Sequence, residues 1–179
     1  MRKLHFKYIL FLLLLVGCAD TVTPTIQTQI DKLAILFKSL DTTITQEEAL
    51  QLSQDLFIET KRLSKEFELT SPPYWHNFLV NVGVREKGLC YHWSDALYVY
   101  VSKRDYSSFS FHLMGANIGE YWFEHNVLMV VGKESKIQKN IIQEGIIIDP
   151  WRNSGKLYFS KVKDDTDYVW QHRMHRVCQ

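Results

Sequence analysis

The sequence predicts an α+β protein in which helices come first and an antiparallel sheet follows. As far as about residue 101, apolar residues recur at the three- and four-residue spacing of amphipathic helices. From Ser107 onward the chain has short runs that alternate or are continuously apolar, separated by turn signals, which is typical of strands. Helices followed by strands favour the α+β class over an alternating α/β arrangement.

Residues 26–70 are expected to form a helical segment of two helices, at about 25–40 and 46–68. The first has an apolar face at helical spacing, formed by Ile26, Ile30, Leu33, Phe37 and Leu40. The second begins at a capping box, in which Thr45 accepts from the Glu48 N–H and the Glu48 side chain reaches back. The two helices either pack on the rest of the protein, which we favour, or form a hairpin that binds a partner.

Two shorter helices are expected at about 74–82 and 90–101. Pro72 and Pro73 suit the start of the first, and Gly83 ends it. Its apolar face is formed by Trp75, Phe78, Leu79 and Val82. The second helix has core spacing at Trp93, Ala96, Leu97 and Tyr100. It is the central helix of the predicted fold and packs on the sheet.

The strands are expected in the second half of the chain. The predicted runs are 109–113, 126–131, 145–148 and 156–160. The run at 109–113 alternates, and the next two are continuously apolar and therefore suited to a buried position. A turn at 153–155 precedes the last run. An antiparallel meander is the simplest arrangement for strands with short connections.

Residues 1–17 have the pattern of a secretory signal peptide: basic residues first, then an apolar segment at 9–16 that is short for a bilayer span. The following Leu15-Val16-Gly17-Cys18 resembles the bacterial lipobox. The resemblance implies cleavage before Cys18, attachment of diacylglycerol and an acyl chain to Cys18, and a lipidated tether over 18–25. An ordinary signal peptide, or a short membrane anchor that ends in cysteine, is the alternative.

A lipidated Cys18 makes membrane lipid the expected partner and the bacterial cell envelope the expected location. Ala19, rather than Asp, follows Cys18, which by resemblance to enteric sorting rules implies the outer membrane, facing the periplasm. Removal of residues 1–17, with three basic residues and no acidic one, changes the formal net charge from +1 to −2. A slightly acidic chain lacks the positive charge for nucleic-acid binding, so no nucleic-acid partner is expected.

Cys90 is the candidate nucleophile. It follows Gly88-Leu89 at the predicted start of a helix, where backbone N–H groups and the helix dipole favour a thiolate. The N–H of Cys90 itself is a candidate to stabilise an oxyanion. A disulfide with Cys178 is the structural alternative, although Cys178 is the penultimate residue.

A nucleophilic cysteine needs a base and a group that orients the base. If 126–131 and 145–148 pair as an antiparallel hairpin with His125 opposite Asp149, Leu128 faces Ile146 and the two apolar runs overlap almost fully. His125 and Asp149 then lie side by side. A shift of the register by one residue would place them on opposite faces.

Other histidines make weaker cases for the base. His112 lies on an alternating strand with no acidic partner, and His92 is expected to point away from Cys90. A zinc site at Cys90, His92 and His125 is disfavoured because the sequence has no closely spaced ligand pair there. No metal and no cofactor are therefore expected.

The chain resembles the transglutaminase-like branch of the papain-like cysteine hydrolases over about residues 74–161. The resemblance is carried by Gly88-Leu89-Cys90, Trp93, Ala96, His125 and Asp149-Pro150. It implies a transglutaminase-like domain at 71–179, with Cys90 as nucleophile, His125 as base and Asp149 as orienting acid. Asn126-Val127 departs from the pattern, in which an aromatic residue often follows the histidine. Trp75, Asn77 and Asn81 are equal candidates for an oxyanion-stabilising side chain.

These observations lead to two functional hypotheses. The first is an envelope lipoprotein that acts as a cysteine peptidase, amidase or acyl transferase on envelope protein or peptidoglycan peptide. The second is a non-catalytic lipoprotein that binds an envelope partner, in which Cys90 is buried or bridged.

Overall fold

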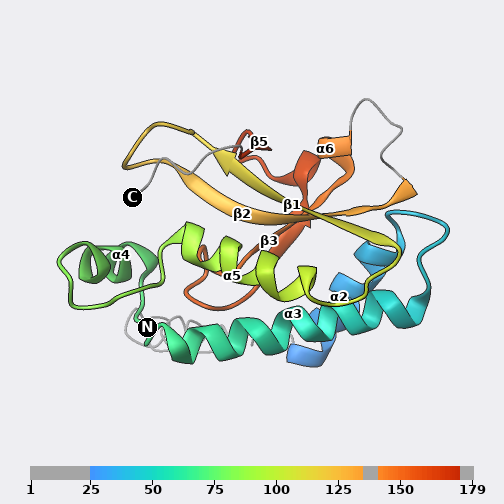
Figure 1. Cartoon of the computed structure of the whole chain (residues 1–179), viewed down its shortest axis with the longest axis horizontal. Helices are drawn as coiled ribbons and strands as arrows, with labels where there is room; N and C mark the ends of the chain where they lie inside the picture. The colour runs from blue at the N-terminus through green and yellow to red at the C-terminus, as the bar shows by residue number, and fades with distance from the viewer. Residues whose placement is uncertain (1–24, 135–140, 174–179) are drawn as a thin grey trace, which may run out of the picture.

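The computed structural model describes residues 25–134 and 141–173 of the chain (Figure 1). Cys18, Ala19, Cys178 and the predicted cleavage site lie outside these residues. The helices are α2 (Ile26–Lys38), α3 (Gln46–Glu66), α4 (Pro73–Asn81), α5 (Cys90–Ser102) and α6 (Ile141–Glu144), with a 3-10 helix η2 (Val162–Asp164). The strands are β1 (Phe109–Ala116), β2 (His125–Gly132), β3 (Ile146–Asp149), β4 (Tyr158–Lys161) and β5 (Gln171–His172). The predicted α+β class is confirmed.

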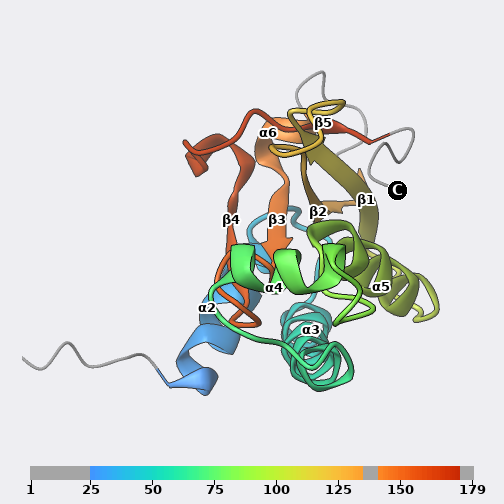
Figure 2. The ribbon, with the colours of Figure 1, turned by 90° about the vertical axis from the view of Figure 1, so that its left-hand side faces the viewer.

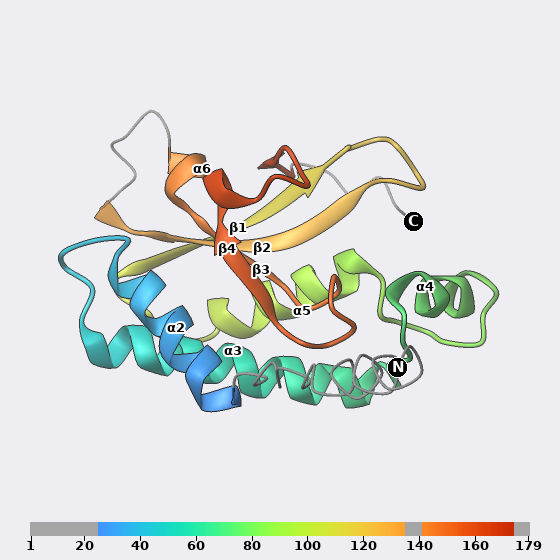
Figure 3. The ribbon, with the colours of Figure 1, turned by 180° about the vertical axis from the view of Figure 1, so that it is seen from behind.

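The five strands form one antiparallel sheet in the order β4-β3-β2-β1-β5. Helices α2, α3 and α5 lie on one side of this sheet (Figures 2 and 3). The main core fills the space between them, and its fully buried side chains include Leu33, Phe37, Leu52, Leu56, Trp93, Leu97, Leu128 and Ile146. A second cluster lies on the other side, where Val162 and Trp170 pack against β2 and β3. The C-terminal part of the chain therefore covers the face that the helices leave open.

Helices α2 and α3 match the two helices predicted for residues 26–70. Leu33, Phe37 and Leu56 are fully buried in the main core, so these helices pack on the sheet rather than project as a separate hairpin. The Thr45 hydroxyl accepts from the Glu48 N–H at 3.1 Å, as predicted. The predicted return contact is wrong, because the Glu48 carboxylate accepts from the backbone N–H of Ser108 at 3.0 Å. It thereby ties α3 to the segment that enters β1.

Helix α4 is oriented differently from the prediction. Trp75 and Phe78, which were expected on the apolar face of this helix, are each 50% exposed. The buried side chain is His76, which is fully buried, bonds the Lys87 carbonyl through Nε2 at 2.8 Å and faces Thr70 through Nδ1. These polar contacts fix the core-facing side of α4, because a buried imidazole without partners would be costly.

Gly88 lies against the His76 ring and has a φ of +120°. A Cβ at this position would lie 2.0 Å from His76 Nε2. We expect Gly88→Ala to lower the free energy of unfolding by about 3 kcal/mol, from backbone strain plus the steric clash. Gly83→Ala is the matched control, because Gly83 also has a positive φ, +78°, but nothing lies within 4 Å of its Cβ position. We expect this control to cost about 1 kcal/mol.

Urea unfolding of the full-length chain in mild detergent, followed by circular dichroism, measures both values. Equal destabilisation by the two substitutions would contradict the steric role of His76. The comparison matters for the site because Gly88 forms the turn that leads into Cys90.

The register of β2 and β3 differs from the prediction by two residues. Leu128 pairs with Ile148 rather than with Ile146. Extending this register by one residue places Asp149 opposite Val127, so that Asp149 lies diagonally across from His125. Because side chains alternate with a period of two, a shift of two residues keeps them on the same face of the sheet. The inference that His125 and Asp149 share a face therefore survives an incorrect register.

Within residues 25–134 and 141–173, the structure has no helix that combines the length and the apolar character required to traverse a bilayer. Helix α4, the start of α5 and the connection between β1 and β2 lie at one end of the molecule (Figures 1 and 3). The side chains discussed below gather at this end.

Candidate active site

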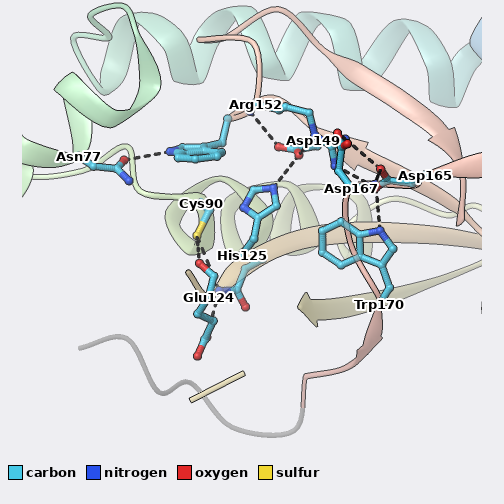
Figure 4. Close-up of polar contacts among 11 residues, drawn as sticks. Asn77, Cys90, Glu124, His125, Asp149, Arg152, Asp165, Asp167 and Trp170 are labelled. Carbon is cyan, nitrogen blue, oxygen red and sulfur yellow. Dashed lines mark hydrogen bonds and ion pairs between the residues drawn. The ribbon is translucent and has the colours of Figure 1, made fainter. Parts of the chain in front are cut away.

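The structure brings Cys90, His125 and Asp149 together (Figure 4). Cys90 is the first residue of α5, His125 the first of β2 and Asp149 the last of β3. Each is at least nine-tenths buried. The site is thus assembled from the ends of three core elements, which gives its side chains rigid supports.

His125 and Asp149 form a buried pair. The distance from His125 Nε2 to Asp149 Oδ2 is 2.7 Å. Burial lowers the pKa of His125, but the charge and hydrogen bond of Asp149, together with the neighbouring Cys90 sulfur, outweigh it and raise that pKa to about 9. Burial raises the pKa of Asp149, but His125 and Arg152 outweigh it and lower that pKa. An imidazolium beside a carboxylate is therefore the favoured state at neutral pH.

The other ring nitrogen of His125 faces the cysteine side of the site. Nδ1 is buried and has no hydrogen-bond partner in the described part of the chain. In Figure 4 the His125 ring lies between Cys90 and the Asp149 carboxylate. Cys90 has no disulfide partner among the described residues, and its Sγ donates to the Glu124 carbonyl at 3.8 Å. The alternative of a bridge to Cys178 involves a residue outside the described part of the chain.

Asn126 supplies a polar contact to Cys90 that the sequence did not indicate. Its Nδ2 lies 3.7 Å from Cys90 Sγ and donates to Glu124 Oε1 at 3.2 Å. Its Oδ1 accepts from Arg173 Nη1 at 3.1 Å, and Arg173 in turn pairs with Asp95. Since both ends of the amide are held, the Asn126 side chain is oriented to donate to the sulfur, a contact that favours a thiolate. Asn126 follows the histidine where the resembled family often has an aromatic residue. This departure was the one feature of the sequence that could have drawn attention to Asn126.

Arg152 also holds the Asp149 carboxylate, in part at the same oxygen that His125 contacts. Its Nε donates to Asp149 Oδ2 at 3.0 Å, and its backbone N–H donates to Oδ1 at 3.1 Å. The Arg152 guanidinium also pairs with Asp165, which accepts from Trp170 Nε1 at 2.8 Å. This network connects the acid of the site to the segment that precedes β5.

Three aromatic rings surround His125. The centroids of Trp151 and Tyr168 each lie 4.8 Å from that of the imidazole, and that of Trp170 lies 5.6 Å away. These rings exclude water from the His125–Asp149 pair, which strengthens the electrostatic interaction between them. Tyr168 and Trp170 are distant from His125 in sequence, and no local motif indicates them.

The three candidates for an oxyanion-stabilising side chain have different surroundings in the structure. Trp75 is half exposed and stacks on Phe78. Asn77 Oδ1 accepts from Trp151 Nε1 at 2.9 Å, which turns Nδ2 away from Trp151 at a cleft that Asn77 lines together with Cys90. Asn81 also lines this cleft. The N–H of Cys90, the first residue of α5, remains the backbone candidate, because the first N–H groups of a helix have no carbonyl four residues earlier in the helix to bond.

The other histidines that the structure describes lie outside this arrangement. His92 Nδ1 accepts from the N–H groups of Gly88 and Leu89 at 3.1 and 3.2 Å, so it caps α5. His112 lies on β1 beside His172. Among the described residues, no three His, Cys, Asp or Glu side chains are grouped so that they could hold a metal ion.

A larger hollow, of about 610 Å³, lies between α3 and α5 and does not include Cys90. Its rim is rich in charged side chains, and none of the three candidate residues lines it.

No protein-family model matches the sequence, no curated protein matches it, and no solved structure matches the fold.

Proposed function

We propose that this protein is a cysteine-nucleophile amide hydrolase or acyl transferase. The observation that carries the proposal is the buried His125–Asp149 pair, whose unpartnered Nδ1 lies on the side of Cys90. A thiol at a helix start, a histidine beside it and a carboxylate that orients the histidine are the parts that acyl transfer to cysteine requires.

The chemistry follows from the roles of these groups. In the resting site His125 already holds the proton of Cys90 as an imidazolium, and the thiolate of this pair attacks an amide carbonyl to form a tetrahedral oxyanion. In this proposal the Cys90 N–H and the Asn77 amide stabilise that charge, which is supported by their residues lining the same cleft. When the C–N bond breaks, His125 returns the proton to the leaving amine and an acyl-thioester remains on Cys90. Attack by water completes hydrolysis, whereas attack by an amine completes transfer.

The cellular setting is also a proposal. Residues 1–18 support a lipoprotein signal peptide and a lipid anchor at Cys18, in the outer membrane and facing the periplasm. The order of Cys90, His125 and Asp149 supports a transglutaminase-like or papain-like core at 71–179. Substrates at that location are envelope proteins or peptidoglycan peptides.

The rate of iodoacetamide alkylation tests the proposal. The protein is the full-length chain in detergent with Cys178→Ser, and mass spectrometry locates the label. An unperturbed thiol ionises near pH 8.5. We expect Cys90 to react at pH 6 at least about tenfold faster than an unperturbed cysteine thiol, because His125 holds its proton.

His125→Ala is expected to return the reaction to the pH profile of an ordinary thiol. His112→Ala is the matched control and is expected to leave the rate unchanged, because His112 lies on β1 outside the site. If His125→Ala left the rate and its pH profile unchanged, the acid–base pair would be absent and the binding-protein hypothesis would be favoured.

A further inference from the structure

A cleft of about 400 Å³ opens directly beside Cys90. Its size lies within the range of about 300 to 1,000 Å³ that is usual for ligand sites. Leu89, Cys90 and Tyr91 are among its lining residues, so a molecule in the cleft lies against the start of α5 that carries the thiol. The proposed function uses Cys90 but leaves the shape and chemistry of this cleft unexplained.

Helix α4 forms one wall of the cleft. The wall residues follow the spacing of a single helix face and are Tyr74, Asn77, Phe78, Asn81 and Val82. Such a face is normally buried against the core, yet here Tyr74 is 70% exposed and Val82 53%. The core contact of α4 is made instead by His76. An exposed apolar helix face beside a nucleophile is a feature of a binding groove.

The connection between β1 and β2 forms the facing wall. Tyr121 and Trp122 line the cleft from this side, and Trp122 is 75% exposed. The connection is anchored at its end by Glu124, whose carboxylate accepts from the Gly119 N–H at 3.0 Å and from Asn126. The aromatic wall is therefore tied to the amide that contacts Cys90.

The lining has a distinct chemical character. Among residues 25–134 and 141–173, no lysine or arginine lines the cleft, and the one carboxylate that does, Glu124, already accepts two hydrogen bonds. An anionic ligand such as a phosphate therefore finds no counter-charge among these residues. The carboxamides of Asn77 and Asn81 both donate and accept hydrogen bonds, which matches the alternating N–H and C=O groups of a peptide backbone.

We propose that this cleft binds an extended peptide with a large apolar or aromatic side chain next to the carbonyl that Cys90 attacks. The side chain lies between α4 and Trp122, and the backbone bonds Asn77 and Asn81. This inference rests on the proposed function and adds its substrate class. The two are separable, because alkylation by iodoacetamide needs the reactive thiol but not the cleft.

Peptidyl acyloxymethyl ketones test the proposal. Two-residue probes carry Phe, Leu, Ala, Lys or Glu at each position in turn. A palmitoyl acyloxymethyl ketone serves as the non-peptide probe. Labelling forms a C–S bond from Cys90 to the methylene carbon and releases the carboxylate. Rates are measured on the full-length chain with Cys178→Ser and divided by the iodoacetamide rate of the same variant.

At one of the two positions, we expect Phe or Leu to react at least about tenfold faster than Ala, Lys and Glu, a factor that corresponds to burial of one apolar side chain. Phe78→Ala and Trp122→Ala should each remove most of this preference. Ile58→Ala is the matched control, because Ile58 is 62% exposed and lies on α3 outside the cleft. It should leave the preference intact.

Equal rates for all side chains, or a preference that both cleft variants retain, would overturn the substrate class while leaving the proposed function in place. Faster labelling by the palmitoyl ketone than by any peptide would assign the cleft to an acyl chain instead. A thiol that no probe and no iodoacetamide labels would overturn both proposals.

Discussion

Asp149→Asn is expected to slow alkylation of Cys90 at pH 7 by about 10- to 30-fold, because an ordinary thiol with a pKa near 8.5 is only about 3% ionised at that pH. The charge and hydrogen bond of Asp149 are the largest contributions that raise the pKa of His125. Without them, burial lowers that pKa, so the imidazole is neutral and the imidazolium–thiolate pair is lost. Alkylation rates between pH 5 and 10 measure the effect.

Asp167→Asn provides the matched control for this substitution. Asp167 also pairs with Arg152, at 3.3 Å, but its side chain is 68% exposed and does not contact His125. We expect its alkylation rate to stay within about twofold of the wild type, since exposed ion pairs contribute little. Similar loss in both variants would show that Arg152, rather than the His125–Asp149 pair, controls the thiol.

The second expected result is a loss of stability as the pH rises from about 6.5 through about 9. The folded protein holds the pKa of His125 at about 9, above its ordinary value of 6.5. A group whose pKa is raised by folding stabilises the folded state fully below the unfolded value, and this contribution is lost as the pH rises through the folded value. The difference corresponds to at most about 3 kcal/mol.

Urea unfolding at half-unit steps between pH 6 and 10 measures this contribution. His125→Gln is the reference, because the difference between the two curves removes the titration of the groups that do not interact with His125. We expect the wild type to lose its advantage over His125→Gln across this window. Parallel curves would mean that His125 has the same pKa in the folded and unfolded states, which would remove the basis for an ion pair at the site.

Much of the fold followed from local pattern. Apolar spacing and the Thr45 cap located α2 and α3, and the change to short apolar runs located the first four strands. Helix α6 and strand β5 were not expected. Strand β5 has two residues and exposed side chains, so it has no periodicity to detect. It exists because β1 offers an edge with which it pairs.

The side of α4 that faces the core was a local prediction that failed. Trp75 and Phe78 have the more apolar side chains, so periodicity assigned them to the core. The structure buries His76 instead, because Lys87 and Thr70 supply partners for both ring nitrogens. Which side of α4 faces the core therefore depends on hydrogen-bond partners eleven and six residues away, and hydrophobicity alone does not predict it.

The sequence by itself determined the helix and strand order and the positions of Cys90, His125 and Asp149 at the ends of three elements. Strand alternation was enough to place His125 and Asp149 on one face, even with a register that was wrong by two residues. Tertiary structure alone decided what surrounds them: Arg152 on Asp149, Trp170 over His125 and Asn126 against the sulfur. These contacts depend on how distant segments pack, since a buried charge or amide takes its partner from whatever element folding brings beside it.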